Sequence, residues 1–215
     1  MVPTLVYSLT YDNKQLVRLH KNLRLSDPMK VHSTLYGLVL AGGRSSRMGE
    51  DKSRLLWQGK PLYQHMIHLL HKAGIEQVLL SGAGFPEKTV EDLVPGRGPL
   101  SGIHAALMSL EYGERLLVIP VDMPLVPLEA IQTLYEQSDK QQLCCFDGFN
   151  LPVVIPVTED SRRVIVEKIQ SDNPKDYALW RLYQALGGKT IPLPEDRIQL
   201  FSNANTPEEW RRINH

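Results

Sequence analysis

One stretch of the chain combines paired glycines with positive charge, and it runs Leu38-Val39-Leu40-Ala41-Gly42-Gly43-Arg44-Ser45-Ser46-Arg47-Met48-Gly49-Glu50-Asp51-Lys52. An apolar strand that stops at Gly42-Gly43 leaves backbone N–H groups without ladder partners, and glycine lets a bulky anion approach them closely. Arg44, Arg47 and Lys52 add full positive charges around this turn. The stretch therefore predicts a phosphate-binding loop, in which Gly42 and Gly43 donate N–H groups and Arg47 and Lys52 contact the phosphates.

Two familiar phosphate-binding motifs do not fit this stretch. A Walker A loop places lysine directly after glycine, whereas Lys52 follows Asp51. A Rossmann fingerprint needs three spaced glycines after the strand, and no third glycine follows Gly42-Gly43 at that spacing. The alternative to a phosphate-binding loop is a glycine turn lined with solvated arginines. The ordered run of small and charged residues favours the phosphate-binding loop.

Asp122 follows the most apolar run of the sequence, 116–121. In open α/β sheets, residues just beyond the carboxyl ends of parallel strands line the ligand crevice. A carboxylate buried there is costly unless it is paired or bound to a metal, and Mg²⁺ prefers carboxylate and phosphate oxygens. We therefore expect Asp122 to bind a Mg²⁺ ion that bridges a triphosphate. The alternative is an aspartate that caps the turn at 124–128.

The glycine-rich stretch resembles the signature of nucleotidyltransferases that activate small acceptors with a nucleoside triphosphate, and it is most similar to the molybdenum cofactor guanylyltransferases. The resemblance covers about residues 36–215 and continues, in the order typical of the family, through Gly59–Leu62, Gly98–Gly102, Pro120–Pro124 and Asn203–Glu209.

This resemblance implies transfer of GMP from GTP to the phosphate of molybdopterin (Mo-molybdopterin), with release of pyrophosphate and Mg²⁺ as the cofactor. Arg47, Lys52 and Asp122 are then the expected catalytic residues, and Asp122 is also the expected metal ligand. The residues expected to bind the nucleotide are Leu40, Ala41, Gly42, Gly43, Lys52, Asp92, Gly98 and Asp122. The resemblance also implies transient contact with molybdoenzymes or other cofactor-biosynthesis proteins. Two alternatives stay open: a relative that uses CTP or another nucleotide with a molybdopterin or sugar-phosphate acceptor, and a non-catalytic nucleotide-binding regulatory protein.

Asp92 is the residue expected to read the base. Guanine presents N1–H and its 2-amino group side by side, so that one carboxylate can accept from both, whereas cytosine has no such pair; the resemblance places an aspartate against guanine. Asn203 and Asn205 are two residues apart, so on an extended segment their amides face the same way. The resemblance places them on the acceptor side. The alternative is that both amides satisfy loop backbone.

Composition predicts one ordinary globular domain, because 42% of the 215 residues are hydrophobic and 22% are charged. A formal net charge of +0 gives no general attraction to nucleic acid or membranes, and no run approaches the roughly 18 apolar residues of a membrane span. No export signal is evident. The two cysteines, Cys144 and Cys145, are adjacent in an expected strand and would face opposite sides of a sheet. We expect two buried free thiols and a cytoplasmic location.

Residues 1–35 are expected to be an N-terminal extension, as a hairpin or a leader, with residues 36–215 as the nucleotidyltransferase domain. Residues 1–36 contain five Lys or Arg against two Asp. The extension is interpreted either as an accessory hairpin on the sheet edge or as a docking surface for a partner or an acidic acceptor.

Alternating strands and helices from residue 36 onward predict an α/β fold: a three-layer, Rossmann-like domain with a central, mostly parallel sheet, similar to the nucleotide-diphospho-sugar transferases. The strand 151–156 is expected at a sheet edge because prolines flank it. Arg162, Arg163 and Arg181 are expected on solvated faces, with guidance of an anionic acceptor as the alternative. The other expected strands are 75–81, 116–121, 143–146 and 189–193, and the expected helices are 61–73, 103–113, 127–137, 161–170, 175–186 and one that opens at the capping box Thr206-Pro207-Glu208-Glu209.

Overall fold

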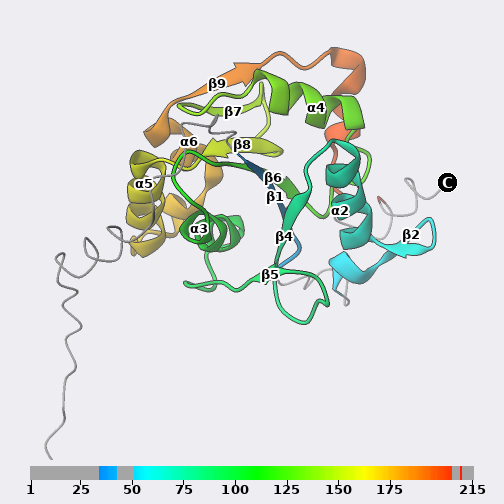
Figure 1. Ribbon diagram of the computed structural model, residues 1–215, viewed down its shortest axis with the longest axis horizontal. Helices are drawn as coiled ribbons and strands as arrows, with labels where there is room; N and C mark the ends of the chain where they lie inside the picture. Colours follow the sequence, from blue (N-terminus) through cyan, green and yellow to red (C-terminus); the bar gives the residue numbers. More distant parts are fainter. Residues whose placement is uncertain (1–33, 43–50, 205–208, 210–215) are drawn as a thin grey trace, which may run out of the picture. The chain divides into compact units, whose positions relative to one another are not determined.

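A seven-stranded sheet forms the centre of the protein in a computed structural model that describes residues 34–42, 51–204 and 209. Its strands are β1 (Leu35–Leu40), β4 (Gln77–Ser81), β5 (Thr89–Val90), β6 (Arg115–Pro120), β7 (Leu143–Phe146), β8 (Val153–Pro156) and β9 (Gly188–Ile191). They lie in the order β5-β4-β1-β6-β8-β7-β9, and every neighbouring pair is parallel except the two that involve β8 (Figure 1). The mostly parallel sheet expected from the sequence is confirmed.

Helices cover both faces of this sheet, as Figure 1 shows. The α-helices are α2 (Leu62–Lys72), α3 (Pro99–Ser109), α4 (Leu128–Gln137), α5 (Glu159–Gln170) and α6 (Leu179–Leu186). Shorter elements are the 3₁₀ turns η2 (Lys52–Arg54), η3 (Pro174–Tyr177) and η4 (Glu195–Phe201), and a hairpin of β2 (Leu56–Trp57) and β3 (Lys60–Pro61). The three-layer α/β architecture is therefore the one that the sequence predicted.

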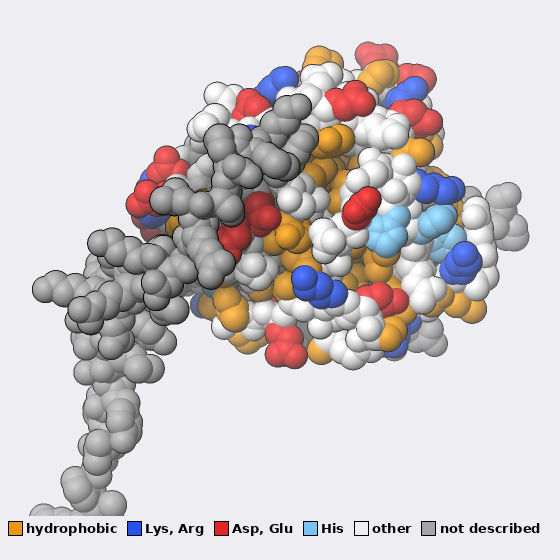
Figure 2. Space-filling view, viewed as in Figure 1, with side chains coloured by type: hydrophobic (Ala, Val, Ile, Leu, Met, Phe, Trp, Pro, Cys, Tyr) orange, Lys and Arg blue, Asp and Glu red, His pale blue; other side chains and the backbone are white. Residues whose placement is uncertain are grey.

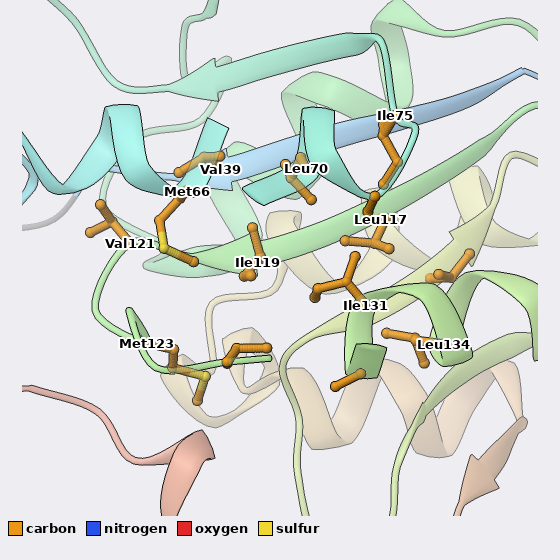
Figure 3. Packing of buried hydrophobic residues seen from close by; sticks show 14 of the residues in the cluster. Val39, Met66, Leu70, Ile75, Leu117, Ile119, Val121, Met123, Ile131 and Leu134 are labelled. Atoms are coloured by element: carbon orange, nitrogen blue, oxygen red, sulfur yellow. The ribbon is translucent and has the colours of Figure 1, made fainter. Parts of the chain in front are cut away.

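The two hydrophobic layers alternate along the strands. Val39 packs with residues of α2 and α4, whereas its neighbours Leu38 and Leu40 pack with residues of α3, α5 and α6. Figure 3 shows the first layer, in which side chains of α2 and α4 meet those of β1 and β6. Cys144 and Cys145 are buried free thiols in opposite layers, as expected. Strands that are covered on both faces read as continuous apolar runs, which is the pattern of β1 and β6.

Strand β8 corrects one expectation, because it is not an edge strand. It pairs antiparallel with β6 on one side and with β7 on the other. Pro152 precedes the strand and Pro156 is its last residue, so the missing N–H groups fall at the ends of the ladder rather than inside it. Proline at a strand terminus therefore did not exclude a central position.

The expected helix at 175–186 is divided into η3 and α6 by the extended residue Ala178. Side chains hold η3 as a separate turn: Asn173 accepts from the N–H of Lys175 at 3.2 Å, and the Tyr177 hydroxyl donates to the carbonyl of Ser171. These local bonds offer the backbone an alternative to the helical ladder.

Arg162 was expected on a solvated face, and this expectation was wrong. Its Nε donates to the Leu107 carbonyl at 3.1 Å, a second guanidinium N–H donates to the Leu110 carbonyl, and the guanidinium lies 4.2 Å from the centre of the Tyr112 ring. The side chain thus satisfies carbonyls at the C-terminal end of α3. Arg163 is about half exposed and pairs with acids of its own helix, whereas Arg181 is less exposed and pairs with Asp176.

Several expectations fall on undescribed residues. The proposed strands or leader before residue 34 and the capping box at 206–209 lie outside the described residues, Glu209 excepted, and the boundary at residue 36 stays a prediction. Within the described ranges, no helix is long and apolar enough to cross a membrane.

Candidate active site

The carboxyl ends of β4, β1 and β6 meet at one edge of the sheet, because these strands are parallel. We call this the carboxyl edge. At the end of β1, the Leu40 carbonyl accepts from the N–H of Val121 at 3.1 Å, so the chain after β1 and the chain after β6 leave the sheet together. Leu40 and Ala41 are buried, and Gly42 is exposed. Leu40 and Ala41 would therefore present backbone rather than side chains to a nucleotide.

Lys52 starts the short turn η2, and Asp51 fixes that turn. The Asp51 carboxylate accepts from the N–H of Ser53 at 3.0 Å and from its hydroxyl at 2.7 Å, as an N-cap residue does. Asp51 also pairs with Arg54 at 3.4 Å, and Arg54 donates to the Gly84 carbonyl at 2.6 Å. The position of Lys52 is thus set by its neighbours. This role of Asp51 was missed in the sequence, although the spacing Asp-x-Ser is a capping signal.

Asp122 lies two residues beyond the end of β6, half-buried and close enough to Lys52 for the two charges to interact. Burial raises the pKa of the Asp122 carboxyl, while the charge of Lys52 and a hydrogen bond from its own backbone act in the opposite direction. A desolvated carboxylate is a suitable ligand for a cation that arrives from solution. Two of the three residues expected to be catalytic, Lys52 and Asp122, therefore lie at one site.

The segment that carries Asn203 reaches the same site. The N–H of Ala204 donates to the main-chain carbonyl of Asp122 at 2.8 Å, and Ala204 is buried whereas Asn203 is exposed. The structure thus brings Lys52, Asp122 and Asn203 together from three distant parts of the sequence. Gly43, Arg47 and Asn205 lie outside the described residues.

The N-terminal end of α3 is built from small residues that pack closely on the sheet. A Cβ atom on Gly102 would lie 2.7 Å from the Cβ of Ser81 and 3.0 Å from a methyl group of Leu40, so only glycine fits between α3 and the ends of β1 and β4. Gly98 precedes the helix with φ of 59° and ψ of −142°, a conformation that L-residues rarely adopt. Nothing lies within 4 Å of where its Cβ would stand. A ligand can therefore approach the backbone of Gly98.

The loop that contains Asp92 is held by Ser101. The buried Ser101 hydroxyl donates to the Val94 carbonyl at 2.7 Å and accepts from the N–H of Arg97 at 3.1 Å. The Arg97 guanidinium lies 4.2 Å from the centre of the Tyr177 ring, which ties this loop to η3. Asp92 is exposed as a whole residue, yet surrounding atoms desolvate its carboxyl enough to raise its pKa. The Arg97–Tyr177 contact had no signal in the sequence, because the two residues are distant in the chain.

Asp122 is also the residue that fits the expected metal. Mg²⁺ is commonly held by only one or two protein carboxylates together with substrate phosphates, so one desolvated carboxylate beside the expected phosphate site is sufficient. Histidine side chains are visible in Figure 2, and His65, His68 and His71 of α2 line a cavity of about 290 Å³. Among the described residues no three His, Cys, Asp or Glu side chains form a metal-binding group.

Comparisons with known proteins identify the family of this chain. A family model described as the MobA-like NTP transferase domain matches residues 37–189. A molybdenum cofactor guanylyltransferase from Xanthomonas euvesicatoria pv. vesicatoria is 33% identical over 179 residues, which cover 83% of this chain and 94% of that relative. A molybdenum cofactor guanylyltransferase from Yersinia pseudotuberculosis is 38% identical over 186 residues, which cover 80% of this chain and 91% of that relative.

A solved structure shows the same fold. Molybdopterin-guanine dinucleotide biosynthesis protein A from Archaeoglobus fulgidus superposes with a TM-score of 0.66 at 21% identity, over 83% of this chain and 96% of that protein. The expected likeness to the nucleotidyltransferase type of α/β fold is confirmed.

Proposed function

The chain belongs to the MobA-like NTP transferase domain family, and on this basis we propose that it transfers GMP from GTP to the phosphate of molybdopterin and releases pyrophosphate. The observation that carries the proposal is the meeting of Lys52, Asp122 and the 203–204 segment at the carboxyl edge. That edge offers one cation, one desolvated carboxylate and the end of a glycine-containing turn. These are the groups that a reaction between two phosphate compounds requires.

The chemistry needs alignment more than a general base. The second pKa of a phosphate monoester is about 6, so the acceptor phosphate is mostly dianionic at neutral pH and is already nucleophilic. One of its oxygens attacks the α-phosphorus of GTP, the bond between the α-phosphorus and the bridging oxygen to the β-phosphate breaks, and pyrophosphate leaves with that oxygen. The protein must hold two polyanions in line and stabilise the charge that develops on the leaving group.

We assign these tasks to residues on the donor side. Lys52 and Arg47 contact the leaving β- and γ-phosphates, and the N–H groups of Gly42 and Gly43 donate to the phosphates. The nucleoside lies against the main chain of Leu40 and Ala41 and closely approaches the backbone of Gly98. Asp92 accepts from N1–H and the 2-amino group of guanine. The open space and strained backbone at Gly98 support this arrangement.

Asp122 would hold Mg²⁺, which supplies positive charge to the triphosphate. On the acceptor side, we assign Asn203 and Asn205 to molybdopterin, and the bond between Ala204 and Asp122 supports that assignment because it places the segment beside the reacting phosphates.

The surroundings of the two thiols support a location in a reducing cytoplasm. Cys144 and Cys145 face opposite layers, and burial, with smaller contributions from Cys144 and Asp147, raises the pKa of the Cys145 thiol to about 11. Thiols of this kind stay protonated and unreactive. We also propose that product transfer involves transient contact with molybdoenzymes or other cofactor-biosynthesis proteins, for which residues 1–35 are the candidate segment.

The decisive experiment measures pyrophosphate release by the purified protein with Mg²⁺ and molybdopterin, comparing GTP, CTP and UTP. Of the three nucleotides, we expect only GTP to support turnover. Turnover with CTP instead would identify a cytidylyltransferase, and calorimetric GTP binding without pyrophosphate release would identify a nucleotide-binding regulator.

Inosine triphosphate tests the role of Asp92, because it lacks the 2-amino group of guanine. We expect the wild-type protein to prefer GTP over inosine triphosphate in kcat/KM by roughly ten- to a hundredfold, the effect of leaving one partner of a buried polar contact unmatched. Asp92→Asn should lose most of this preference. A wild-type preference that survives in Asp92→Asn would assign base reading to another residue.

A further inference from the structure

A second cavity, of about 550 Å³, lies on the opposite side of the carboxyl edge from the Asp92 loop. It is bounded by α6, by β7 and β9, and by the turn that joins β7 to β8. The residues that line it include the aromatic Phe149, Trp180 and Tyr183 and the amide-bearing Asn150 and Gln184. Its volume is in the range of small-molecule sites, which combine apolar and aromatic walls with a few polar groups.

One wall of this cavity, the β7–β8 turn, lies at the same edge of the sheet as Asp122. Strand β7 is parallel to β6, since both are antiparallel to β8, so the β7–β8 turn lies at the carboxyl edge. The Phe149 ring is 5.1 Å from that of Phe201, three residues before Ala204, whose N–H bonds to Asp122. One strand separates β6 from β7, so the turn is about 10 Å from the end of β6. That separation suits a fused-ring acceptor with a phosphate arm.

We propose that this cavity, which we call the α6 pocket, binds the pterin ring system of the acceptor, with Trp180 as its stacking surface and Gln184 and Asn150 as partners for the edge of the ring. This inference rests on the proposed function. It adds residues of α6 and of the β7–β8 turn to an acceptor site that the sequence limited to Asn203 and Asn205.

The aromatic wall is held in position before any ligand arrives. Trp180 is 50% exposed, so much of its indole surface is open to a ligand. The Arg181 guanidinium lies 4.8 Å from the indole centre, and Arg181 is paired with Asp176 at 3.2 Å. The Tyr183 hydroxyl donates to the Asn150 carbonyl, which joins α6 to the turn. A rigid aromatic surface loses little entropy when a flat ring stacks on it.

The electrostatics of the α6 pocket favour a neutral ring over a second triphosphate. Burial raises the pKa values of Tyr183 and Cys145, so both groups remain uncharged. Lys189 is the charged residue among those that line the pocket, and its amino group donates to the Gln137 carbonyl at the end of α4, on the other face of the sheet. Amide side chains donate and accept at once, which matches the 2-amino-4-oxo edge of a pterin.

Guanine carries the same kind of edge, so the test must separate the two rings. We would measure initial rates of pyrophosphate release for the full chain while varying molybdopterin and GTP separately, and then add free pterin or guanosine as inhibitors. Pterin should compete with molybdopterin and not with GTP. Guanosine should compete with GTP.

Trp180→Ala should raise the KM for molybdopterin by about tenfold, the usual size of a lost stacking contact, and should weaken pterin inhibition by a similar factor. The KM for GTP and the calorimetric affinity for GTP should stay unchanged. Trp180→Phe, which keeps an aromatic face, should restore most of the acceptor affinity. Tyr135→Ala is the matched control, because Tyr135 is an exposed aromatic residue on the helix α4, in the other layer.

An unchanged molybdopterin KM in Trp180→Ala, with wild-type pterin inhibition, would overturn the α6 pocket while leaving the guanylyltransferase intact. If guanosine competes with molybdopterin, the α6 pocket binds a purine instead of a pterin, and the proposal is also wrong. If Trp180→Ala lowers the melting temperature, Gln184→Leu replaces it, and the same increase in molybdopterin KM is expected. Failure of the proposed function itself would appear differently, as an absence of pyrophosphate release by the wild-type protein.

Discussion

The two sides of the carboxyl edge are built in different ways. On the donor side, around β4, β1 and the start of α3, the chain uses glycine, serine and backbone groups, and α3 packs on the sheet so closely that Gly102 leaves no room for a Cβ. On the acceptor side, around β7, β9 and α6, aromatic and amide residues line an open cavity of about 550 Å³. The first side presents backbone and charge, and the second presents the faces of side chains.

This difference follows from the ligands that the two sides are proposed to hold. A triphosphate is recognised by N–H groups and cations at fixed positions, which a short loop can supply. A flat ring is recognised by apolar area with a few polar contacts, which require side chains from several elements. Variants on the two sides should therefore fail in different ways.

Lys52→Ala should have the largest effect. We expect kcat to fall by roughly a hundred- to a thousandfold, because one charge that stabilises the leaving pyrophosphate is lost, while the melting temperature stays near the wild-type value. Lys72→Ala, at the exposed end of α2, is the control and should keep wild-type kcat. Near-normal turnover in Lys52→Ala would remove this residue from the mechanism.

Asp122→Asn should lower kcat by about a hundredfold and yet stabilise the fold at neutral pH. The folded-state pKa of Asp122 is raised, so the folded protein binds this proton more tightly than the unfolded chain, and ionisation costs stability as pH rises through the raised pKa. The variant should therefore melt at a higher temperature than wild type at pH 7. The difference should disappear below the unfolded-state pKa, about 3.9.

Thermal melts from pH 3 to 8 would check this prediction. A melting temperature of Asp122→Asn that stays below that of the wild type at pH 7 would contradict a desolvated carboxylate at this position.

Variants of two glycines on the donor side can distinguish an effect on GTP binding, at Gly42, from an effect on packing, at Gly102. A Cβ on Gly42 would meet its neighbours at 3.7 Å, an ordinary contact, whereas one on Gly102 would meet Ser81 at 2.7 Å. Gly42→Ala should keep its melting temperature and bind GTP about tenfold more weakly, a loss of about 1.4 kcal/mol. Gly102→Ala should lose about 1–3 kcal/mol of folding stability through overpacking. Calorimetry and thermal melts of both variants would show whether the two effects are separate.

Tyr177→Leu should have the smallest effect. Removing the ring beneath Arg97 loosens the loop that carries Asp92, and an exposed cation–π contact of about 0.5–1 kcal/mol corresponds to a rise in GTP KM of roughly two- to fivefold. Tyr112→Leu removes a contact of the same 4.2 Å length, with Arg162. This control should leave the GTP KM unchanged. Equal effects in both variants would mean that Arg97 has no positioning role.

The sequence signals on the donor side are local, and they predicted the strands β1 and β6 that lead to it. The apolar run before Gly42-Gly43, the charged residues that follow and Asp122 after the run at 116–121 each lie within a few residues of the element that positions them. The predictions failed where distant residues decide. Flanking prolines suggested an edge for β8, but pairing with β6 and β7 placed it inside the sheet, and Arg162 was expected in solvent but satisfies carbonyls of α3.

The sequence by itself determined the alternation of strands and helices and the end of β1 just before Gly42, because these depend on backbone conformation and on hydrophobic periodicity along one stretch of chain. Only the tertiary structure decided that Lys52 acts on Asp122, that Ala204 bonds to Asp122 and that Arg97 lies on Tyr177. The same is true of the cavity under α6. These contacts join residues that only the pairing order of the sheet brings close, and that order is set by burial of both faces of the sheet rather than by any local signal.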